Sequence, residues 1–393
     1  MTTFDQTYPG LRVLDLATNI AGPFAAMILS DMGADVIKVE RAPAGDDTRG
    51  LPPTHDGTAT VFLSVNRNKR SLLLDLRDAA DRALLLDLAA SADVVVESFP
   101  PGVAEKLGFT FDDFRRRNPD LVVCSVSAFG DGPIGGRMPG YDALVQAVSG
   151  LMSFTGSRGD PTVRIAPSVL DLGTGMWAAM GIMAALARRA AGAGGEHVRP
   201  ALIDTAFNLM NHQLLGYLAT GNEPEKLGSG APSAAPYGVF RASDGELMIA
   251  TASEAQFPRL CAALGLLALL DEPRFATIPD RIANRTELDA LIAARIAGAS
   301  VAHWLDTLAA AGISCGRVNK VGEACRLPEV AERNLFVEIG GGGLGQIRLP
   351  IDPAADGVRR PPPVLGEHSA AIRAAFATGA RDWPAAGSQM SGW

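Results

Sequence analysis

The sequence predicts an α/β fold, in which a parallel sheet is covered by helices and a second, smaller α/β domain belongs to the same chain. Two observations predict it. Short apolar runs of strand length alternate with longer helical segments through the first 200 residues, and such alternation is typical of a parallel sheet flanked by helices. The chain has 393 residues, which is enough for two or three domains at roughly 150 residues each.

A strand, a helix and a second strand open the chain. LRVLDL (11–16) has the continuous apolar run of a buried strand, and DVIKVE (35–40) has the same character. Between them Pro23 suits the first turn of a helix and Gly33 suits its end. The alternation continues with helices and strands that we expect at 77–91, 93–97, 111–117, 120–128, about 172–189, 197–204 and 205–220.

The composition changes near residue 222, where a polar loop precedes YGVFRASDGELMIA (237–250). This segment predicts a β-hairpin with its turn at Asp244-Gly245. We therefore place a large domain at 1–224 and a small domain at 225–329. The remaining residues, 330–393, contain two short strands near 335–339 and 345–349 and a final helix from about 369. By their own pattern they could extend the small domain or return to the large one.

Charge and composition exclude several classes of function. Lys and Arg number 35 against 43 Asp and Glu, a net charge of −8, so we expect no nucleic-acid partner and no attraction to anionic lipid. No uninterrupted apolar run approaches the roughly 18 residues of a membrane span, and no secretory signal is visible, so we expect a cytoplasmic protein without a membrane partner. The 4 cysteines and 5 histidines lack metal-ligand spacing, and we expect no metal.

The first strand-to-helix turn, ATNIAGP (17–23), contains Gly22 alone in place of the G-x-G-x-x-G of dinucleotide-binding proteins. An ordinary nicotinamide-dependent dehydrogenase is therefore disfavoured. Basic residues follow or precede strands at Lys38, Arg41, Lys69 and Arg70. They are either solvated surface charges or a cradle for phosphate at the sheet edge.

Asp171 lies near the start of the long Ala-rich helix, and two interpretations of it stay open. Its carboxylate could cap the helix. Alternatively it could be a nucleophile, with Gly173 and Gly175 leaving space for a bulky acyl group and helix N–H groups facing a developing oxyanion. Tyr141 is either a packed residue or a functional one, and we expect Trp177 and the methionines of the same helix to lie in the core.

Taken together, several segments resemble the class III CoA transferases, the group with formyl-CoA, carnitine and succinate-dependent CoA transferases, whose sister branch is the α-methylacyl-CoA racemases. The resemblance spans nearly the whole chain. Its pieces are GLRVLDLA-x3-AGP (10–23), GADVIKVER (33–41), GDDTR (45–49), SVNRNKRS (64–71), VESF-x-PG (96–102), GYDA (140–143), DLGTG (171–175), APYGVF (235–240), GISCGRVN (312–319) and PPPVLGEH (361–368).

The resemblance implies a Rossmann-like large domain built from both chain ends, with the small domain inserted, so that 330–393 return to the large domain. It also implies a homodimer of two interlocked rings. In the family's pattern the Asp that opens D-L-x-T-G is the nucleophile, which is Asp171 here. Residues implied to bind CoA are Arg41, Lys69, Arg70, Ser98, Phe99, Lys106 and Tyr141. At Ser98 and Lys106 relatives commonly carry Asn and Arg.

The implied reaction uses acyl-CoA as substrate and needs no metal. The Asp171 carboxylate attacks the donor thioester to give an acyl-aspartyl anhydride, CoA thiolate converts this to an aspartyl-CoA thioester, and an incoming carboxylic acid reverses the steps. Ile20 replaces a Gln that formyl-CoA transferases carry, and their Gly-rich lid loop is missing. We therefore do not expect oxalate or formyl-CoA as substrates. The runs GDDTR (45–49), SVNRNKRS (64–71) and GYDA-x3-AVSGLM (140–152) resemble the succinyl-CoA-dependent dicarboxylate transferases, such as those that act on glutarate. This resemblance implies a dicarboxylate acceptor and succinyl-CoA as donor.

Two alternatives remain. Racemases carry His in a G-H-D segment, where this chain has Tyr141, and a phenol with a pKa near 10 is a poor general base. A CoA-binding paralogue without turnover is the second alternative, and the presence of Asp171 argues against it.

Overall fold

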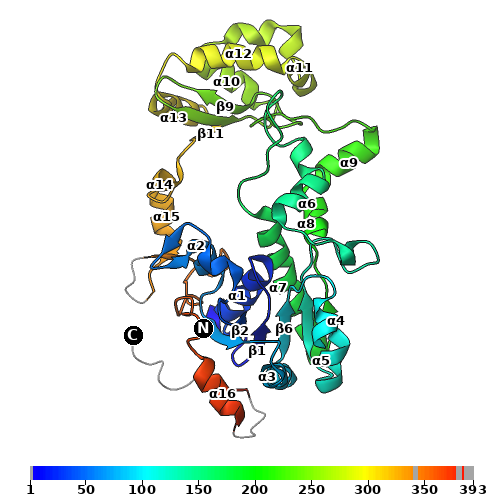
Figure 1. Cartoon of the computed structure of the whole chain (residues 1–393). Coiled ribbons are helices and arrows are strands. Elements are labelled where there is room, and N and C mark those ends of the chain that lie inside the picture. Colours follow the sequence, from blue (N-terminus) through cyan, green and yellow to red (C-terminus); the bar gives the residue numbers. More distant parts are fainter. Residues whose placement is uncertain (1–2, 340–343, 378–382, 385–393) are drawn as a thin grey trace. The chain divides into compact units, whose positions relative to one another are not determined.

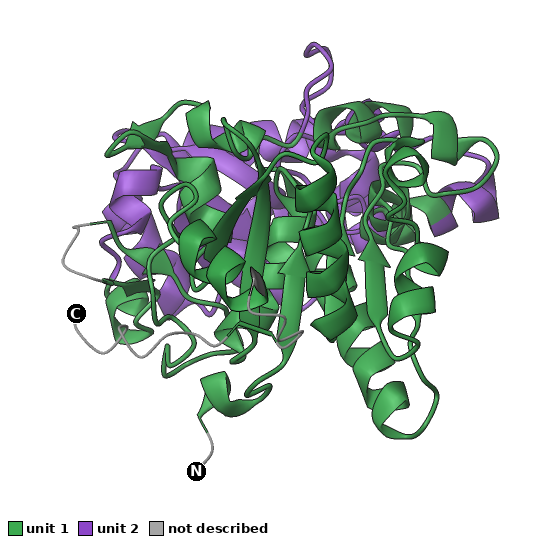
Figure 2. Cartoon of the chain, turned by 60° about the horizontal axis from the view of Figure 1, so that its bottom comes forward, with its two compact units in different colours: residues 1–149, 165–214, 328–393 green, residues 150–164, 215–327 purple. Residues whose placement is uncertain are grey.

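The computed structural model describes residues 3–339, 344–377 and 383–384. The chain forms two compact units, which Figure 2 colours separately. Unit 1 comprises 1–149, 165–214 and 328–393, and unit 2 comprises 150–164 and 215–327. The small domain expected at 225–329 overlaps most of unit 2, which also takes in residues 150–164.

Unit 1 is built on a six-stranded parallel sheet with the order β5-β2-β1-β6-β7-β8. The strands are β1 (Arg12–Asp15), β2 (Asp35–Arg41), β5 (Arg70–Leu74), β6 (Val94–Glu97), β7 (Val122–Ser125) and β8 (His197–Val198). The predicted parallel α/β sheet is therefore confirmed. The chain winds outward from the centre in both directions, so the order reverses between β1 and β6. Ligands of open α/β sheets bind at such a point, outside the carboxyl ends of the strands.

Helices cover both faces of this sheet (Figure 1). Leu14, Ile37 and Val95 belong to a buried cluster with side chains of α3, α5 and α16, while α1 and α7 pack against each other and against strands of the same sheet. The helices of unit 1 are α1 (Ala21–Asp31), α2 (Thr60–Val65), α3 (Ala79–Ser91), α4 (Val103–Leu107), α5 (Phe111–Arg117), α6 (Asp142–Val148), α7 (Val169–Ala190), α8 (Leu202–Leu209), α15 (Pro328–Glu332) and α16 (Ser369–Ala377).

The strand expected at 197–204 is wrong in length, because β8 contains only His197 and Val198. Pro200 has no N–H to donate to a sheet ladder, and α8 begins at Leu202. The helix expected at 205–220 is divided into α8 and α9 (Asn211–Thr220), which meet at Met210.

Helix α7 departs from the prediction that it is a core helix throughout. Met176, Trp177 and Met180 lie on an exposed face, and Trp177 is 48% exposed. The helix is apolar on several sides, and its neighbours in unit 1 cover only part of it. Although no uninterrupted apolar run is long enough, α7 is the one described helix whose length and mean hydropathy, 1.5, match a membrane span. Half of that window is buried within the described structure.

The C-terminal part of the chain hydrogen-bonds to the outer edge of β5. The Ser71 N–H donates to Nδ1 of His368 at 3.2 Å, the His368 N–H donates to the Ser71 carbonyl at 3.0 Å, and the Leu73 N–H donates to Oγ of Ser369 at 3.0 Å. Asn68, just before the strand, accepts from the backbone N–H groups of Arg359 and Arg360. Residues near the chain end therefore satisfy the free edge of this strand.

Unit 2 contains an antiparallel sheet with the order β11-β10-β9. The hairpin expected at 237–250 is confirmed as β9 (Tyr237–Arg241) and β10 (Glu246–Ala250), and β11 (Ser314–Arg317) pairs with β10. Side chains of Phe240, Leu247 and Trp304 form part of its core. Its helices are α10 (Gln256–Leu264), α11 (Ile278–Ala283), α12 (Arg285–Ile296), α13 (Val301–Ala310) and α14 (Val321–Ala324).

Two further strand pairs lie in unit 1, β3 (Thr54–His55) with β4 (Thr58–Ala59) and β12 (Phe336–Val337) with β13 (Gln346–Ile347).

Candidate active site

Two loops meet at the carboxyl ends of β1 and β6, where the strand order reverses. The Thr18 N–H, in the turn after β1, donates to Oγ of Ser98 at 3.0 Å. The Phe99 N–H donates to Oε2 of Glu97 at 2.7 Å, and its ring stacks on Phe109 with centroids 6.4 Å apart. Ser98 thus joins the two loops, and Phe99 anchors the second loop to the core.

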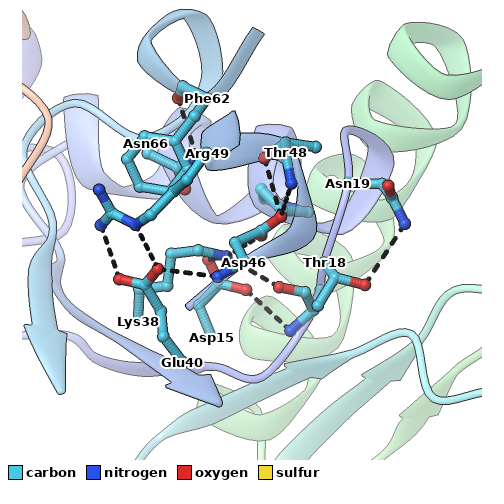
Figure 3. Close-up of polar contacts among 12 residues, drawn as sticks. Asp15, Thr18, Asn19, Lys38, Glu40, Asp46, Thr48, Arg49, Phe62 and Asn66 are labelled. Atoms are coloured by element: carbon cyan, nitrogen blue, oxygen red, sulfur yellow. Dashed lines mark hydrogen bonds and ion pairs between the residues drawn. The ribbon is translucent and has the colours of Figure 1, made fainter. Parts of the chain in front are cut away.

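A buried cluster of charges supports the turn after β1 (Figure 3). Nζ of Lys38 donates to the Ala17 carbonyl at 2.9 Å and pairs with Asp46 at 2.9 Å. Nζ of Lys69 pairs with Asp15 at 2.8 Å and donates to Oδ1 of Asn66. Oδ1 of Asp15 in turn accepts the Ala17 N–H. The cluster therefore fixes the backbone of this turn through both its N–H and its carbonyl.

Burial and neighbouring charges set the protonation of the two ammonium groups in this cluster. Burial lowers the pKa of Lys69 to about 8, with the Lys38 charge acting in the same direction and Asp15 opposing it. Burial also acts to lower the pKa of Lys38, but Asp15, Asp46 and Glu40 outweigh it and the pKa is raised. Lys38 is thus held as a cation by the carboxylates around it.

The basic residues predicted to bind CoA fall into two groups. Lys69 and Arg70 are buried, and Arg70 pairs with Asp35 at 2.5 Å, so the alternative of solvated surface charge is wrong for both. Their charges are matched by carboxylates rather than directed to an open cradle. Arg41 is exposed and pairs with Asp47 at 2.8 Å, and Lys106 is exposed in the last turn of α4. Of these four basic residues, Arg41 and Lys106 are the two that carry their charge at the surface of unit 1.

Asp171 is the third residue of α7, and a different residue caps that helix. Oδ2 of Asp142, the first residue of α6, accepts the N–H groups of Leu170 at 2.8 Å and Asp171 at 3.3 Å. Oδ1 of Asp142 accepts from Nε2 of Gln146 at 2.6 Å. The interpretation of Asp171 as the helix cap is therefore wrong, because Asp142 performs that role.

The surroundings of the Asp171 carboxylate oppose its ionisation. Burial raises its pKa to about 7, and the negative charge of Asp142 adds to the effect. Within the described ranges no cation pairs with Asp171 and no group donates a hydrogen bond to its carboxylate. A carboxylate that is neither capping a helix nor neutralised is available to react, and one with a raised pKa is a more basic nucleophile.

The glycines after Asp171 serve helix packing. A Cβ at Gly173 would lie 2.8 Å from Cγ2 of Thr205 in α8, and one at Gly175 would lie 2.7 Å from the Ala21 carbonyl and 2.9 Å from the Phe24 ring in α1. The expectation that they clear space for an acyl group is therefore wrong. The first N–H groups of α7 are also occupied, by Asp142 and by the Ser168 carbonyl, so they do not face a developing oxyanion as expected.

The packing of Gly175 also locates Asp171. Ala21 begins α1 directly after the β1 turn, and Asp171 precedes Gly175 by one helical turn, which is about 6 Å of rise. Asp171 thus lies near the edge of the sheet where the strand order reverses. Tyr141 is the residue before Asp142 and is 72% exposed, so the interpretation of Tyr141 as a packed residue is wrong.

The model of CoA-transferase family III matches residues 8–369. The chain belongs to this family. As a CoA-transferase it is similar to the acetyl-CoA:oxalate CoA-transferase of Acetobacter aceti, with 37% identity over 94% of this chain and 96% of the relative. It is 35% identical to the succinate–glutarate CoA-transferase of Agrobacterium fabrum, over 94% and 95% of the two chains. A CaiB/BaiF family protein from Brucella suis has a similar structure, with a TM-score of 0.83, 35% identity and coverage of 95% and 99%.

The family resemblance inferred from the sequence motifs is thus confirmed, whereas the roles of the individual site residues stay predictions. Sequence reasoning gave no role to Asp142, although it stands beside Tyr141 in the GYDA segment. One signal could have pointed to it: an Asp at the start of a helix with a Gln one turn later, a pair that can hydrogen-bond at i,i+4. The partner helix α7 that Asp142 caps lies too far along the chain for a local pattern to show.

Proposed function

We propose that this CoA-transferase uses Asp171 as a covalent nucleophile to move CoA from an acyl-CoA donor to a dicarboxylic acid. The observation that carries the proposal is the Asp171 carboxylate itself, which is not used as a cap, has no cation beside it among the described residues and has a pKa raised to about 7 by burial and by Asp142. It lies near the switch point of the sheet, where open α/β folds bind their ligands.

In the proposed sequence an oxygen of Asp171 attacks the thioester carbonyl carbon, and the C–S bond breaks to release CoA thiolate. The thiolate sulfur then attacks Cγ of Asp171, the bond from Cγ to the bridging oxygen breaks, and the donor acid leaves as a carboxylate. The acceptor carboxylate reverses these two steps. Since one thioester replaces another, the energy change is small and the enzyme's contribution is to hold the reactants together.

For CoA, the exposed residues Arg41, Lys106 and Tyr141 and the loop of Ser98 and Phe99 are proposed as contacts. Lys69 and Arg70 are proposed to act indirectly, since their side chains are buried against carboxylates. Lys69 belongs to the buried cluster that fixes the turn after β1, which would form one wall of the site.

For the acceptor, the family relatives favour a dicarboxylate. One is named for oxalate, one for glutarate, and another from Haloarcula marismortui for mesaconate, and all three acids carry two carboxylates. The relative named for oxalate is as similar to this chain as the relative named for glutarate. These similarities therefore do not favour glutarate over oxalate, although Ile20 led us to expect that oxalate is not a substrate. Succinyl-CoA and acetyl-CoA are the proposed donors to test first.

We also propose that the enzyme works as a homodimer of interlocked subunits. Helices α6, α7 and α8 contact one another and carry an exposed apolar surface formed by Leu144, Val148, Met176, Trp177, Met180 and Phe207. Exposed apolar side chains gathered on neighbouring helices mark candidate interaction sites. A second copy of the chain is the proposed occupant, because Asp171 lies on the same helix and a partner there would cover the site as well.

The test is a CoA-transfer assay with mass-spectrometric detection. Wild type, Asp171→Asn and a control variant, Asp306→Asn, are given succinyl-CoA or acetyl-CoA with a panel of mono- and dicarboxylic acids. Asp306 is exposed on α13 of unit 2. New acyl-CoA products are expected from wild type and the control and none from Asp171→Asn. Transfer by Asp171→Asn at the wild-type rate would overturn the assignment of Asp171, and α-proton exchange in a branched acyl-CoA without transfer would favour a racemase.

A further inference from the structure

Asp142 is held as an acceptor at the start of α7, next to the proposed nucleophile. It is buried, with 5% of its surface exposed, and it accepts three hydrogen bonds, two from the backbone of α7 and one from Gln146. Gln146 is itself fixed, because its Oε1 accepts the Ile165 N–H at 2.9 Å. A side chain that only accepts hydrogen bonds from N–H groups is suited to the ionised form, so a buried negative charge stands beside Asp171.

Of the helices packed against the start of α7, α1 contacts it at Gly175 through Ala21 and Phe24, and α8 contacts it at Gly173 through Thr205. These contacts are made by uncharged groups. Among the described residues the Asp142 carboxylate is the one charged group that acts on Asp171. When both side chains are ionised, two negative charges lie close together in a partly buried place, which is unfavourable.

In the proposed reaction the charge of Asp171 is lost and regained. In the free enzyme the side chain is a carboxylate at pH values above its pKa, which burial and Asp142 raise to about 7. In the anhydride and in the CoA thioester it is neutral, and the negative charge has left on the CoA sulfur or on the released acid. The charge of Asp142 stays throughout, so the repulsion exists in the free enzyme and is absent from both covalent intermediates.

We propose that Asp142 is a positioning residue whose fixed negative charge, held at the start of α7, raises the energy of the free Asp171 carboxylate and so favours the covalent intermediates. This inference rests on the proposed function of Asp171. The electrostatic role of Asp142 is distinct from its capping of α7, because an uncharged Asn at this position could still accept the two backbone hydrogen bonds. The charge therefore has a consequence for catalysis that the hydrogen bonds alone do not have.

The experiment measures the fraction of enzyme that carries CoA on Asp171. Wild type, Asp142→Asn and Gln146→Met are incubated with succinyl-CoA and succinate at fixed ratios without an acceptor, and intact-protein mass spectrometry gives the fraction of adduct. Both variants lose the hydrogen bond between residues 142 and 146, but only Asp142→Asn loses the charge. The adduct equilibrium constant is expected to fall in Asp142→Asn about tenfold for each pKa unit that the charge contributes, and to stay within about twofold of wild type in Gln146→Met, because charge repulsion sets it.

A second readout is the pH dependence of adduct formation in wild type and in Asp142→Asn. Attack requires the Asp171 carboxylate, so the rate of adduct formation rises with pH through the pKa of Asp171, with a midpoint near 7 expected. In Asp142→Asn the midpoint moves down, because the repelling charge is gone. A wild-type midpoint near the ordinary value of 3.8, or equal adduct fractions in Asp142→Asn and Gln146→Met, overturns the role of Asp142 while leaving the function of Asp171 in place. Absence of any adduct on Asp171 in wild type overturns both.

Discussion

At the scale of single residues, Asp142 and Asp171 show how surroundings give two carboxylates different roles. Asp142 accepts three hydrogen bonds and is used by the fold. Asp171 receives none within the described ranges and is left with burial and a like charge, which raise its pKa to about 7. A buried carboxylate whose pKa is raised by its surroundings is typical of active sites.

The raised pKa of Asp171 predicts a pH-dependent cost in stability. Because the folded protein holds this proton up to about pH 7 and the unfolded chain releases it near 3.8, wild type loses stability as the pH rises through this interval. Asp171→Asn removes the carboxyl group. It should be more stable than wild type at pH 8, by about 1 to 3 kcal/mol after allowance for solvent screening, and equal to it near pH 3.5.

Thermal unfolding of both proteins at several pH values checks this prediction, with Asp306→Asn as the control that should show no such gain. A gain from Asp171→Asn that is as large at pH 3.5 as at pH 8 would show that the carboxyl group is not the cause.

Lys69 and Arg41, both predicted to bind CoA, should respond differently to substitution. Lys69→Met leaves Asp15 without its closest ion-pair partner in a buried place, and breaking such a pair costs about 3 kcal/mol. Arg41→Met breaks an exposed pair with Asp47 and should cost less than about 1 kcal/mol, but it should raise KM for acyl-CoA. Urea unfolding and KM measured on both variants separate the roles. A Lys69→Met protein of normal stability and raised KM would mean that Lys69 contacts the ligand directly.

At the scale of elements, α7 depends on its glycines for its distance from α1. A methyl group at Gly175 would lie 2.7 Å from the Ala21 carbonyl, which is backbone and cannot turn away. Gly175→Ala should therefore destabilise the protein by about 1 to 3 kcal/mol through overpacking, and it should slow CoA transfer because α1 follows the turn at the site. Gly216→Ala in α9 is the matched control.

The control works because a Cβ at Gly216 meets nothing within 4 Å, and replacing glycine by alanine in an open helix position stabilises by about 0.5 to 1 kcal/mol. Unfolding curves of Gly175→Ala and Gly216→Ala measure the difference in stability between the two variants. A Gly175→Ala protein as stable as the control would mean that α7 moves away from α1 at little cost.

The elements that could be predicted from sequence are those with a strong local pattern. Strands β1, β2 and β6 and helices α1, α3 and α5 lie within a few residues of their expected places, because each is a buried apolar run or a helical segment with a recognisable start or end. The break between α8 and α9 was not predicted, since the apolar pattern continues across it, and the predicted β8 is too long because the prediction does not treat Pro200 as its end. Residues such as Lys69 and Asp142 depend on partners distant in sequence, which no local pattern records.

At the scale of the whole molecule, the exposed apolar surface of α6, α7 and α8 predicts self-association. Light scattering on wild type should give a mass of two chains. Trp177→Arg places a charge on that surface, where the side chain is 48% exposed, and should give monomers or misassembled protein with little transfer activity. Monomeric, fully active wild type would contradict the homodimer.

Interlocking makes a stronger prediction than association alone, because two linked rings separate only when a subunit opens. Two differently tagged preparations mixed under native conditions should yield no mixed dimers over days, and mixed dimers should form after joint unfolding and refolding. Exchange within minutes would show an ordinary dimer.

The hydrogen bonds between β5 and the C-terminal segment bear on how the protein is made. Ser71 and His368 are 297 positions apart, so while the ribosome is extending the chain, the outer edge of β5 lacks these partners until the segment around His368 emerges. An unpaired strand edge is a template for aggregation, and translation at about 5 to 20 residues per second leaves it open for many seconds. Nascent chains of this protein are therefore expected to need protection of this edge until residues 357–369 have emerged, and a chain that stops before residue 357 would have a sheet with an open edge.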